Sequence, residues 1–226
     1  MVDASTARRW VERWDRQQEG YVADREERFA VIADVVQAVA GREDPFIVDA
    51  GCGPGSLAAR LVDRMPGATV VGVDADPVLL ALAGGAYGDR EGLRFVDADL
   101  RQEGWTETLG LDRPADAVVS TTALHWLYRE ELARTYKEFA GLLRSGGAYV
   151  DGDHMFAGPD LPVLDGLQRA VHAGRERRVG LQPDDDWQQW WDAVTADPEL
   201  ADPVARRGQR PLEHNHGGDV WYDERI

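Results

Sequence analysis

Short apolar runs rich in β-branched residues alternate with longer amphipathic stretches over most of the chain. The runs end in polar residues, and the stretches between them repeat apolar side chains every three or four positions. Strands that alternate with helices in this way predict a doubly wound α/β fold with a mostly parallel sheet, whose ligands bind beyond the carboxyl ends of the strands. We expect five strands, at Phe46–Asp49, Thr69–Asp74, Leu93–Asp97, Ala117–Thr121 and Ala148–Asp151.

The helical periodicity outside these runs predicts helices on both sides of the strand region. Two helices are expected in the first forty residues. A further apolar stripe predicts a helix directly before the fifth strand, and Gly146 and Gly147 are expected to close it. Two more helices are expected downstream, at Leu161–Val171 and after Pro183.

Composition and charge restrict the class of protein. The 226 residues, 43% of them hydrophobic, are enough for one domain with a full core or for a domain with a small lid. No apolar stretch approaches the ~20 residues that cross a bilayer, and the N-terminus lacks the apolar segment of an export signal. The single cysteine, Cys52, excludes an intramolecular disulfide and favours a cytoplasmic protein. The formal net charge of −16 argues against a general nucleic-acid binder.

The segment that follows the first predicted strand is the most informative part of the chain. The strand ends in Asp49, and three glycines follow at alternate positions, Gly51, Gly53 and Gly55. Glycine has no Cβ, so a ligand can lie against the backbone there. The next predicted strand ends in Asp74, whose carboxylate is well placed to accept hydrogen bonds from the two hydroxyls of a ribose. Together these signals predict a nucleoside-cofactor site on a parallel sheet.

Four motifs in the right order give the chain a family resemblance. They are Val48–Gly55, Val71–Asp74, Arg94–Leu100, and Ala115–Leu127 followed by Leu142–Gly147. The chain resembles class I S-adenosylmethionine-dependent methyltransferases, particularly the small-molecule branch that includes trans-aconitate methyltransferase-like proteins. The resemblance covers the region from Phe46 to Asp153 and implies a Rossmann-like fold, an enzyme, and S-adenosylmethionine as its cofactor.

The resemblance also implies roles for individual residues. The three glycines would pass close to the methionine and ribose portions of the cofactor, and Asp49 would lie near its amino group. Asp74 would hold the ribose hydroxyls, and Asp99 would accept a hydrogen bond from the adenine amino group, with Leu100 against the ring. Four more residues are implied to border the cofactor, two after the fourth strand and two in the N-terminal helices: Ser120, Thr121, Tyr21 and Arg28.

The end of the chain departs from the family pattern, which adds a sixth strand and an antiparallel seventh. No strand-like run follows Asp151, and the segment from Pro198 onward has no strong period, so it is expected to be loop. Without those strands the fifth strand would be an edge of the sheet. The expected organisation is an N-terminal helical lid (1–41), a cofactor-binding core (42–155) and a helical C-terminal part that covers the acceptor pocket (156–226).

Two histidines are candidate catalytic bases. An acceptor that is a hydroxyl or a weakly acidic C–H must lose a proton during methyl transfer. His125 and His154 each follow the end of a strand that faces the predicted site, and histidine titrates in the right range. The alternative for each is a structural histidine that hydrogen-bonds the backbone, and an acceptor that is already a carboxylate would need no base.

The tryptophans allow two interpretations. Trp126, directly after His125, is the expected aromatic contact to the acceptor. Trp187, Trp190 and Trp191 stand at helical spacing, which is more typical of core residues than of a pocket.

The leading functional hypothesis is methyl transfer from S-adenosylmethionine to the O, N or C atom of a small molecule by in-line displacement. A non-catalytic cofactor-binding or scaffold protein of the same fold is the alternative. A nicotinamide-dependent oxidoreductase is less favoured, because Ser56 stands where that fingerprint needs glycine or alanine. No metal is expected, since Asp151–His154 and His214–His216 lack a complete ligand set. The expected partner is a small-molecule acceptor, with neither nucleic acid nor membrane; the acceptor's identity and the oligomeric state stay open.

Overall fold

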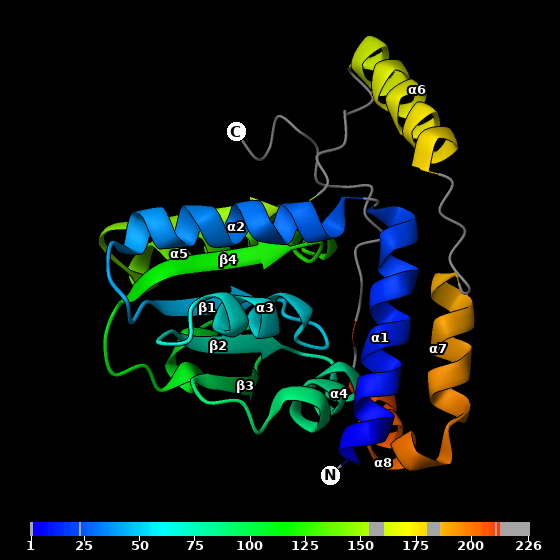
Figure 1. Ribbon diagram of the computed structural model, residues 1–226, viewed down its shortest axis with the longest axis horizontal. Helices are drawn as coiled ribbons and strands as arrows, with labels where there is room; N and C mark the ends of the chain where they lie inside the picture. Colours follow the sequence, from blue (N-terminus) through cyan, green and yellow to red (C-terminus); the bar gives the residue numbers. More distant parts are fainter. Residues whose placement is uncertain (1, 23, 154–160, 180–185, 211, 213–226) are drawn as a thin grey trace.

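A five-stranded parallel sheet forms the centre of the molecule (Figure 1). The computed structural model describes residues 2–22, 24–153, 161–179, 186–210 and 212. The strand order is β3-β2-β1-β4-β5, and every neighbouring pair is parallel. The predicted doubly wound α/β fold is therefore confirmed. The strands are β1 (Phe46–Ala50), β2 (Thr69–Asp74), β3 (Leu93–Asp97), β4 (Ala115–Thr121) and β5 (Leu143–Gly152).

The strand order reverses at β1, which fixes where a ligand can bind. β1 is buried at all five positions and pairs with β2 on one side and with β4 on the other. The connections after β1 and after β4 therefore leave the sheet in opposite directions. This reversal opens a crevice beyond the carboxyl ends of the two strands.

Helices cover both faces of the sheet and one of its ends. One apolar cluster joins α2 and α3 to one face, and a second joins α5 to the other. A third cluster joins α1, α4 and α7, and Figure 1 shows α1 and α7 side by side at the end of the sheet where the strands finish. The helices are α1 (Ala4–Tyr21), α2 (Arg25–Ala40), α3 (Ser56–Arg64), α4 (Pro77–Tyr87), α5 (Arg129–Leu142) and α7 (Trp187–Ala196).

Trp190 fixes α7 to α1. Its side chain has no exposed surface, and its ring lies 4.8 Å from that of Trp14 and 5.9 Å from that of Trp10. Both pairs are edge-to-face, the arrangement that aromatic rings favour. The prediction that Trp190 is a core residue is confirmed.

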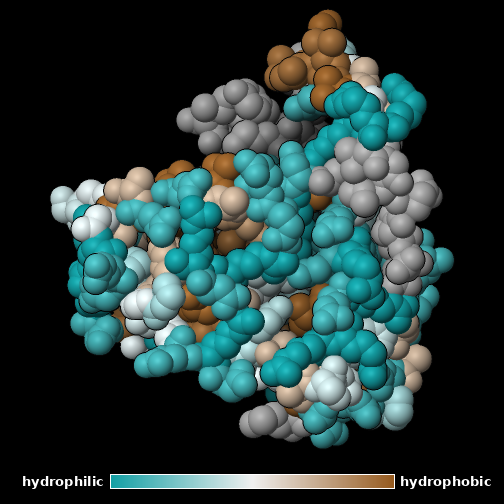
Figure 2. Space-filling view, viewed as in Figure 1, coloured by the Kyte–Doolittle hydropathy of each residue, from teal (hydrophilic) through white to brown (hydrophobic). Residues whose placement is uncertain are grey.

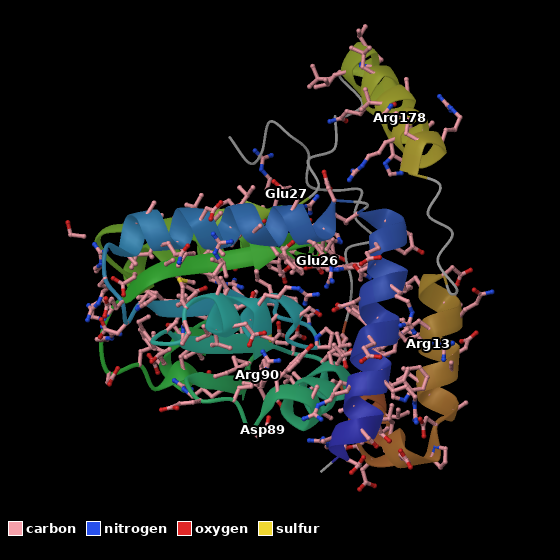
Figure 3. The ribbon with its side chains drawn as sticks, in the orientation of Figure 1. Arg13, Glu26, Glu27, Asp89, Arg90 and Arg178 are labelled. Atoms are coloured by element: carbon pink, nitrogen blue, oxygen red, sulfur yellow. The ribbon has the colours of Figure 1, made fainter. Side chains whose placement is uncertain are left out.

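Asp15 connects α1 to α2 and α3. Its carboxylate accepts hydrogen bonds from Arg25 at 2.7 Å, from the Ser56 hydroxyl at 2.6 Å and from Arg60 at 3.2 Å. Arg60 also donates to Glu26, which Figure 3 labels on α2, at 2.8 Å. α1 is thus held at the end of the sheet by a shared ion-pair network as well as by apolar packing.

The prediction that Gly146 and Gly147 end the helix before the fifth strand is wrong. α5 ends at Leu142, and Leu143 already pairs with Ala115 as the first residue of β5. Gly146 lies within β5 with φ +78°, where the pairing of β4 and β5 is irregular. The two glycines therefore accommodate an irregularity within β5. A pair of glycines can mark such an irregularity in a strand as well as the end of a helix.

The prediction that the segment from Pro198 onward is loop is also wrong for residues 198–208. A 3₁₀ turn, η3 (Pro198–Leu200), leads into α8 (Ala201–Gly208). An eight-residue helix is too short to show a period. Its stability comes from tertiary contacts, among them the fully buried Leu200 and an ion pair from Arg207 to α4.

No strand follows β5 in the part of the chain that the structure describes, so β5 is an edge of the sheet there. The next described element is α6 (Pro162–Val179), which is longer than the predicted helix and stands away from the sheet in Figure 1. Several of its apolar side chains are exposed and form the brown region at the top of Figure 2. None of the described helices combines the length and the apolar character needed to span a membrane.

Candidate functional site

A cavity of about 480 Å³ lies beyond the carboxyl ends of β1, β2 and β4. Its walls come from the turn after β1, the ends of the neighbouring strands and the helices α1, α7 and α8. This is the crevice that the reversal of strand order predicts. Eight of the residues proposed from the sequence line it: Tyr21, Gly51, Gly53, Asp74, Asp99, Leu100, Thr121 and His125.

The turn after β1 brings backbone close to the cavity. The N–H groups of Gly51 and Cys52 donate to the Val73 carbonyl, which fastens the turn to β2. Gly51 has φ +73°, and a Cβ there would lie 2.4 Å from that of Ala123. Gly53 has φ +54°, and nothing lies within 4 Å of the position of its absent Cβ. Gly51 thus allows close packing, whereas Gly53 leaves open space for a ligand.

Gly55, the third glycine of the motif, does not line the cavity. It has φ +83° and caps the start of α3. A Cβ at this position would lie 2.7 Å from the ring of Phe95. Its role in the structure is therefore the packing of α3 against the sheet.

Asp74 links the glycine turn to the end of β2. Its Oδ2 accepts a hydrogen bond from the Gly53 N–H at 2.8 Å, and its Oδ1 accepts one from the Asp76 N–H at 2.8 Å. Burial raises the pKa of Asp74 to about 6. Each oxygen keeps a further lone pair for a ligand hydroxyl.

Asp49 is a buried carboxylate directly behind the glycine turn. Its side chain has no exposed surface, and neither oxygen has a hydrogen-bond partner among the described residues. Burial raises its pKa to about 7; the nearby Ala58 N–H acts against this rise, and the charge of Asp74 adds to it. A buried polar group without a partner destabilises the protein unless a ligand supplies one.

Asp99 lines the cavity beyond β3 but is already paired. Arg101 donates to it in a bidentate arrangement, Nε to Oδ1 at 2.9 Å and Nη2 to Oδ2 at 2.8 Å. Burial raises the pKa of Asp99, but the hydrogen bonds from Arg101 outweigh this effect and leave the pKa below its ordinary value. Leu100 contributes an apolar surface beside this pair.

His125 and Asp153 form a hydrogen-bonded pair at the other end of the cavity. Nδ1 of His125 lies 2.7 Å from Oδ1 of Asp153, and the His125 backbone N–H donates to Oδ2 at 2.8 Å. The Asp153 side chain has no exposed surface, whereas His125 lines the cavity. An Nδ1–H that donates to the carboxylate makes Nε2 the proton-accepting nitrogen of the neutral ring. The second predicted base, His154, lies outside the described residues.

Ser120 and Arg28, like Asp49 and Gly55, are predicted site residues that do not line the cavity. Ser120 is fully buried, and its hydroxyl donates to the Ala50 carbonyl at 2.8 Å, so it joins β4 to β1. Arg28 on α2 donates to the Gly152 carbonyl at the end of β5. Both roles in the structure are contacts between elements, whereas Thr121, next to Ser120, lines the cavity.

Aromatic side chains form one wall of the cavity. Trp14, Trp126, Trp187 and Trp191 all line it. The Trp126 ring lies 4.9 Å from that of His125 and 6.1 Å from that of Trp187, which lies 5.4 Å from Trp14. Trp126 thus occupies the expected place. Trp191 is buried in the third apolar cluster, as predicted, and also reaches the cavity wall, whereas Trp187 is only partly buried, because α7 turns one face to α1 and another to the cavity.

Several residues of the cavity wall were not predicted from the sequence. Arg25 lines it from the start of α2, and Thr122 lines it with φ +50°, a conformation that non-glycine residues seldom adopt. Arg207 of α8 donates to Asp76 at 2.6 Å and lies 4.0 Å above the Trp191 ring. No local sequence pattern predicts that these residues line the cavity, because the packing of elements that are distant in the sequence brings them there.

The family comparison agrees with this geometry. Residues 47–147 match the model of a methyltransferase domain. An uncharacterised methyltransferase of Geobacillus sp. (strain WCH70) is 29% identical over 78% of this chain and 76% of its own length. The crystal structure of DesVI from Streptomyces venezuelae superposes with a TM-score of 0.53, at 24% identity, over 66% of this chain and 58% of that one. The structural likeness supports the fold alone.

Relatives described as trans-aconitate 2-methyltransferases also match. That of Azoarcus sp. (strain BH72) is 34% identical over 59% of this chain, and that of Klebsiella pneumoniae (strain 342) is 28% identical over 87% of it. This chain spans 48% and 60% of the lengths of those two relatives. These matches support the prediction of a class I methyltransferase, and so of an enzyme.

Proposed function

Because this chain carries a class I methyltransferase domain, we propose that it transfers a methyl group from S-adenosylmethionine to a small-molecule acceptor. One observation carries the proposal. A single cavity is lined at one end by the glycine turn, Asp74 and Asp99, and at the other by His125, which is paired with Asp153. A cofactor site and a proton-accepting group would thus face the same cavity.

The residues present fit S-adenosylmethionine. The open space at Gly53 suits close approach of a ligand to the backbone, and Asp74 presents two carboxylate oxygens for the ribose hydroxyls. The unpartnered carboxylate of Asp49 suits the cofactor's ammonium group, directly or through water. Asp99 and Leu100 line the same cavity, and we assign the adenine to them.

The cofactor supplies an electrophilic methyl group on a sulfonium. In the proposed transfer, a bond from the acceptor's lone pair to the methyl carbon would replace the C–S bond, whose electrons would stay on sulfur. His125 takes the acceptor's proton on Nε2, and Asp153 stabilises the resulting imidazolium through Nδ1–H. The wall formed by Trp14, Trp126 and Trp187 would exclude water and orient the acceptor.

The remaining parts of the proposal concern organisation and location. The helices within residues 1–41, and the described helices α7 and α8 within residues 156–226, cover the site on the core formed by residues 42–155. The cavity contacts of α1, α7 and α8 support this division. A cytoplasmic location and a small-molecule partner, without nucleic acid, complete the proposal.

Isothermal titration calorimetry on the full chain tests the cofactor. We expect S-adenosylmethionine and S-adenosylhomocysteine to bind with a stoichiometry of one, and NADH not to bind. Tight NADH binding without a response to S-adenosylmethionine would overturn the proposal. Release of S-adenosylhomocysteine in the presence of an acceptor panel then separates an enzyme from a cofactor-binding scaffold.

A further inference from the structure

Each arginine that lines the cavity among the described residues forms an ion pair with a carboxylate of the protein. Arg25 pairs with Asp15 at 2.7 Å, Arg101 with Asp99 at 2.8 Å, and Arg207 with Asp76 at 2.6 Å. These three are the only arginines among the described lining residues, and no lysine is among them. A site for a polycarboxylate needs cations that can form charge-assisted hydrogen bonds with the ligand. Here each guanidinium already neutralises an acid of the protein.

The electrostatic field of the cavity also disfavours an anion. Besides the acids that pair with these arginines, Asp74 lines the cavity, and Asp49 and Asp153 are buried beside it. The chain as a whole carries a formal net charge of −16. A ligand with two or three carboxylates would meet like charges locally and globally, which opposes both association and binding.

The walls around His125 suit a planar ring instead. Trp126 lies against the histidine ring, and Trp187 and Trp14 continue the aromatic surface at ring separations of 6.1 and 5.4 Å. Aromatic walls bind planar apolar ligands through burial and through offset or edge-to-face contacts.

The pair of His125 and Asp153 indicates that the acceptor has a proton to lose. A carboxylate is already ionised at neutral pH and gains nothing from a base. A phenolic hydroxyl, with a pKa near ~10, is protonated at neutral pH and becomes a better nucleophile as its proton leaves. Of these two kinds of acceptor, the phenol is the one that makes use of a histidine held by a buried carboxylate.

We propose that the acceptor is a phenol, a planar aromatic compound with a hydroxyl and without carboxylates, rather than an aliphatic polycarboxylate. The inference rests on the proposed methyl transfer. The phenol oxygen would form the O–CH₃ bond as the C–S bond breaks, and its proton would pass to Nε2 of His125. The products are an aryl methyl ether, S-adenosylhomocysteine and one proton.

Binding to the full chain loaded with S-adenosylhomocysteine tests the inference without turnover. Calorimetry would compare four phenols (phenol, catechol, 2-naphthol and 8-hydroxyquinoline) with trans-aconitate. We expect at least one phenol to bind tenfold or more tightly than trans-aconitate, and to yield its methyl ether, identified by mass spectrometry, when S-adenosylmethionine is supplied.

Substitutions of Trp126 localise the binding. Trp126→Leu should weaken phenol binding fivefold or more with S-adenosylhomocysteine affinity unchanged, and Trp126→Phe should restore most of the loss. Trp105→Phe is the control, because Trp105 is buried in the core, donates to Glu138 and does not line the cavity.

The outcomes are distinguishable. Binding of trans-aconitate with no binding of any phenol overturns the acceptor class and leaves methyl transfer intact. Failure of all four phenols to bind the loaded chain also overturns it. Failure of S-adenosylhomocysteine to bind removes the proposed function itself, and this inference with it.

Discussion

The two ends of the cavity are built in different ways. At the ends of β2 and β3, Asp74 and Asp99 are held by groups from their own strand ends and from the adjoining turn. At the ends of β4 and β5, His125 meets Asp153, 28 positions further along the chain, and α1 and α7 supply the aromatic wall. The proposed cofactor binding would therefore depend on sequence motifs at the strand ends, whereas the proposed acceptor chemistry would depend on how distant elements dock. Substitutions at the two ends should accordingly change different measurements.

The largest effect is expected from His125→Gln. Loss of a positioned base typically reduces turnover by ~10²–10⁴-fold, so kcat should fall by that factor while S-adenosylhomocysteine affinity stays within about twofold. Steady-state kinetics with a phenol and calorimetry with S-adenosylhomocysteine measure the two quantities. His172→Gln is the matched control, because His172 is exposed on α6 and does not line the cavity. A loss confined to cofactor affinity would assign His125 to the other end of the site.

Asp49→Asn should stabilise the ligand-free protein at alkaline pH. The ordinary pKa of Asp49 is 3.8, and burial raises it to about 7 in the folded protein. A raised pKa gives a stability contribution that is complete below the unfolded value and is lost as pH rises through the folded value. Between pH 5 and pH 8 the wild type should lose on the order of 2–3 kcal/mol relative to Asp49→Asn. Urea unfolding at the two pH values measures this change, and parallel pH profiles would contradict it.

Asp74→Asn tests the cofactor end alone. Loss of charge-assisted hydrogen bonds of ~1.5–3 kcal/mol should weaken S-adenosylhomocysteine binding by ~10–150-fold, with little change in kcat at saturating cofactor. Asp97→Asn is the control, because Asp97 also ends a strand but pairs with Arg210 and does not line the cavity. Equal effects of the two substitutions would mean that Asp74 acts through general charge and not through contact.

The difference between the two ends of the cavity also explains which features could be predicted from the sequence. The strand positions and the turn from Gly51 to Gly53 follow from apolar runs and glycine spacing, which are local properties. The partnership of His125 with Asp153 depends on the register of β4 and β5, which aligns Thr121 with Gly152 and has no local signature. Sequence reasoning accordingly considered Asp153 only as part of an incomplete set of metal ligands, which it rejected, and not as a partner of His125. The helix α8 was not predicted for a related reason. It is stabilised by packing against other elements, and its eight residues are too few to show a helical period in the sequence.

The smallest effect is expected at Arg207, the contact through which α8 reaches the cofactor end. Its guanidinium pairs with Asp76 and stacks on Trp191, but the side chain is 29% exposed, so solvent screens the ion pair. Arg207→Gln should therefore weaken S-adenosylhomocysteine binding by about fivefold or less, corresponding to ~1 kcal/mol. Arg206→Gln, on the exposed face of the same helix, should leave the affinity unchanged. A loss as large as that of Asp74→Asn would mean that α8 holds the cofactor directly, and the distinction between a locally built end and a docked end would fail.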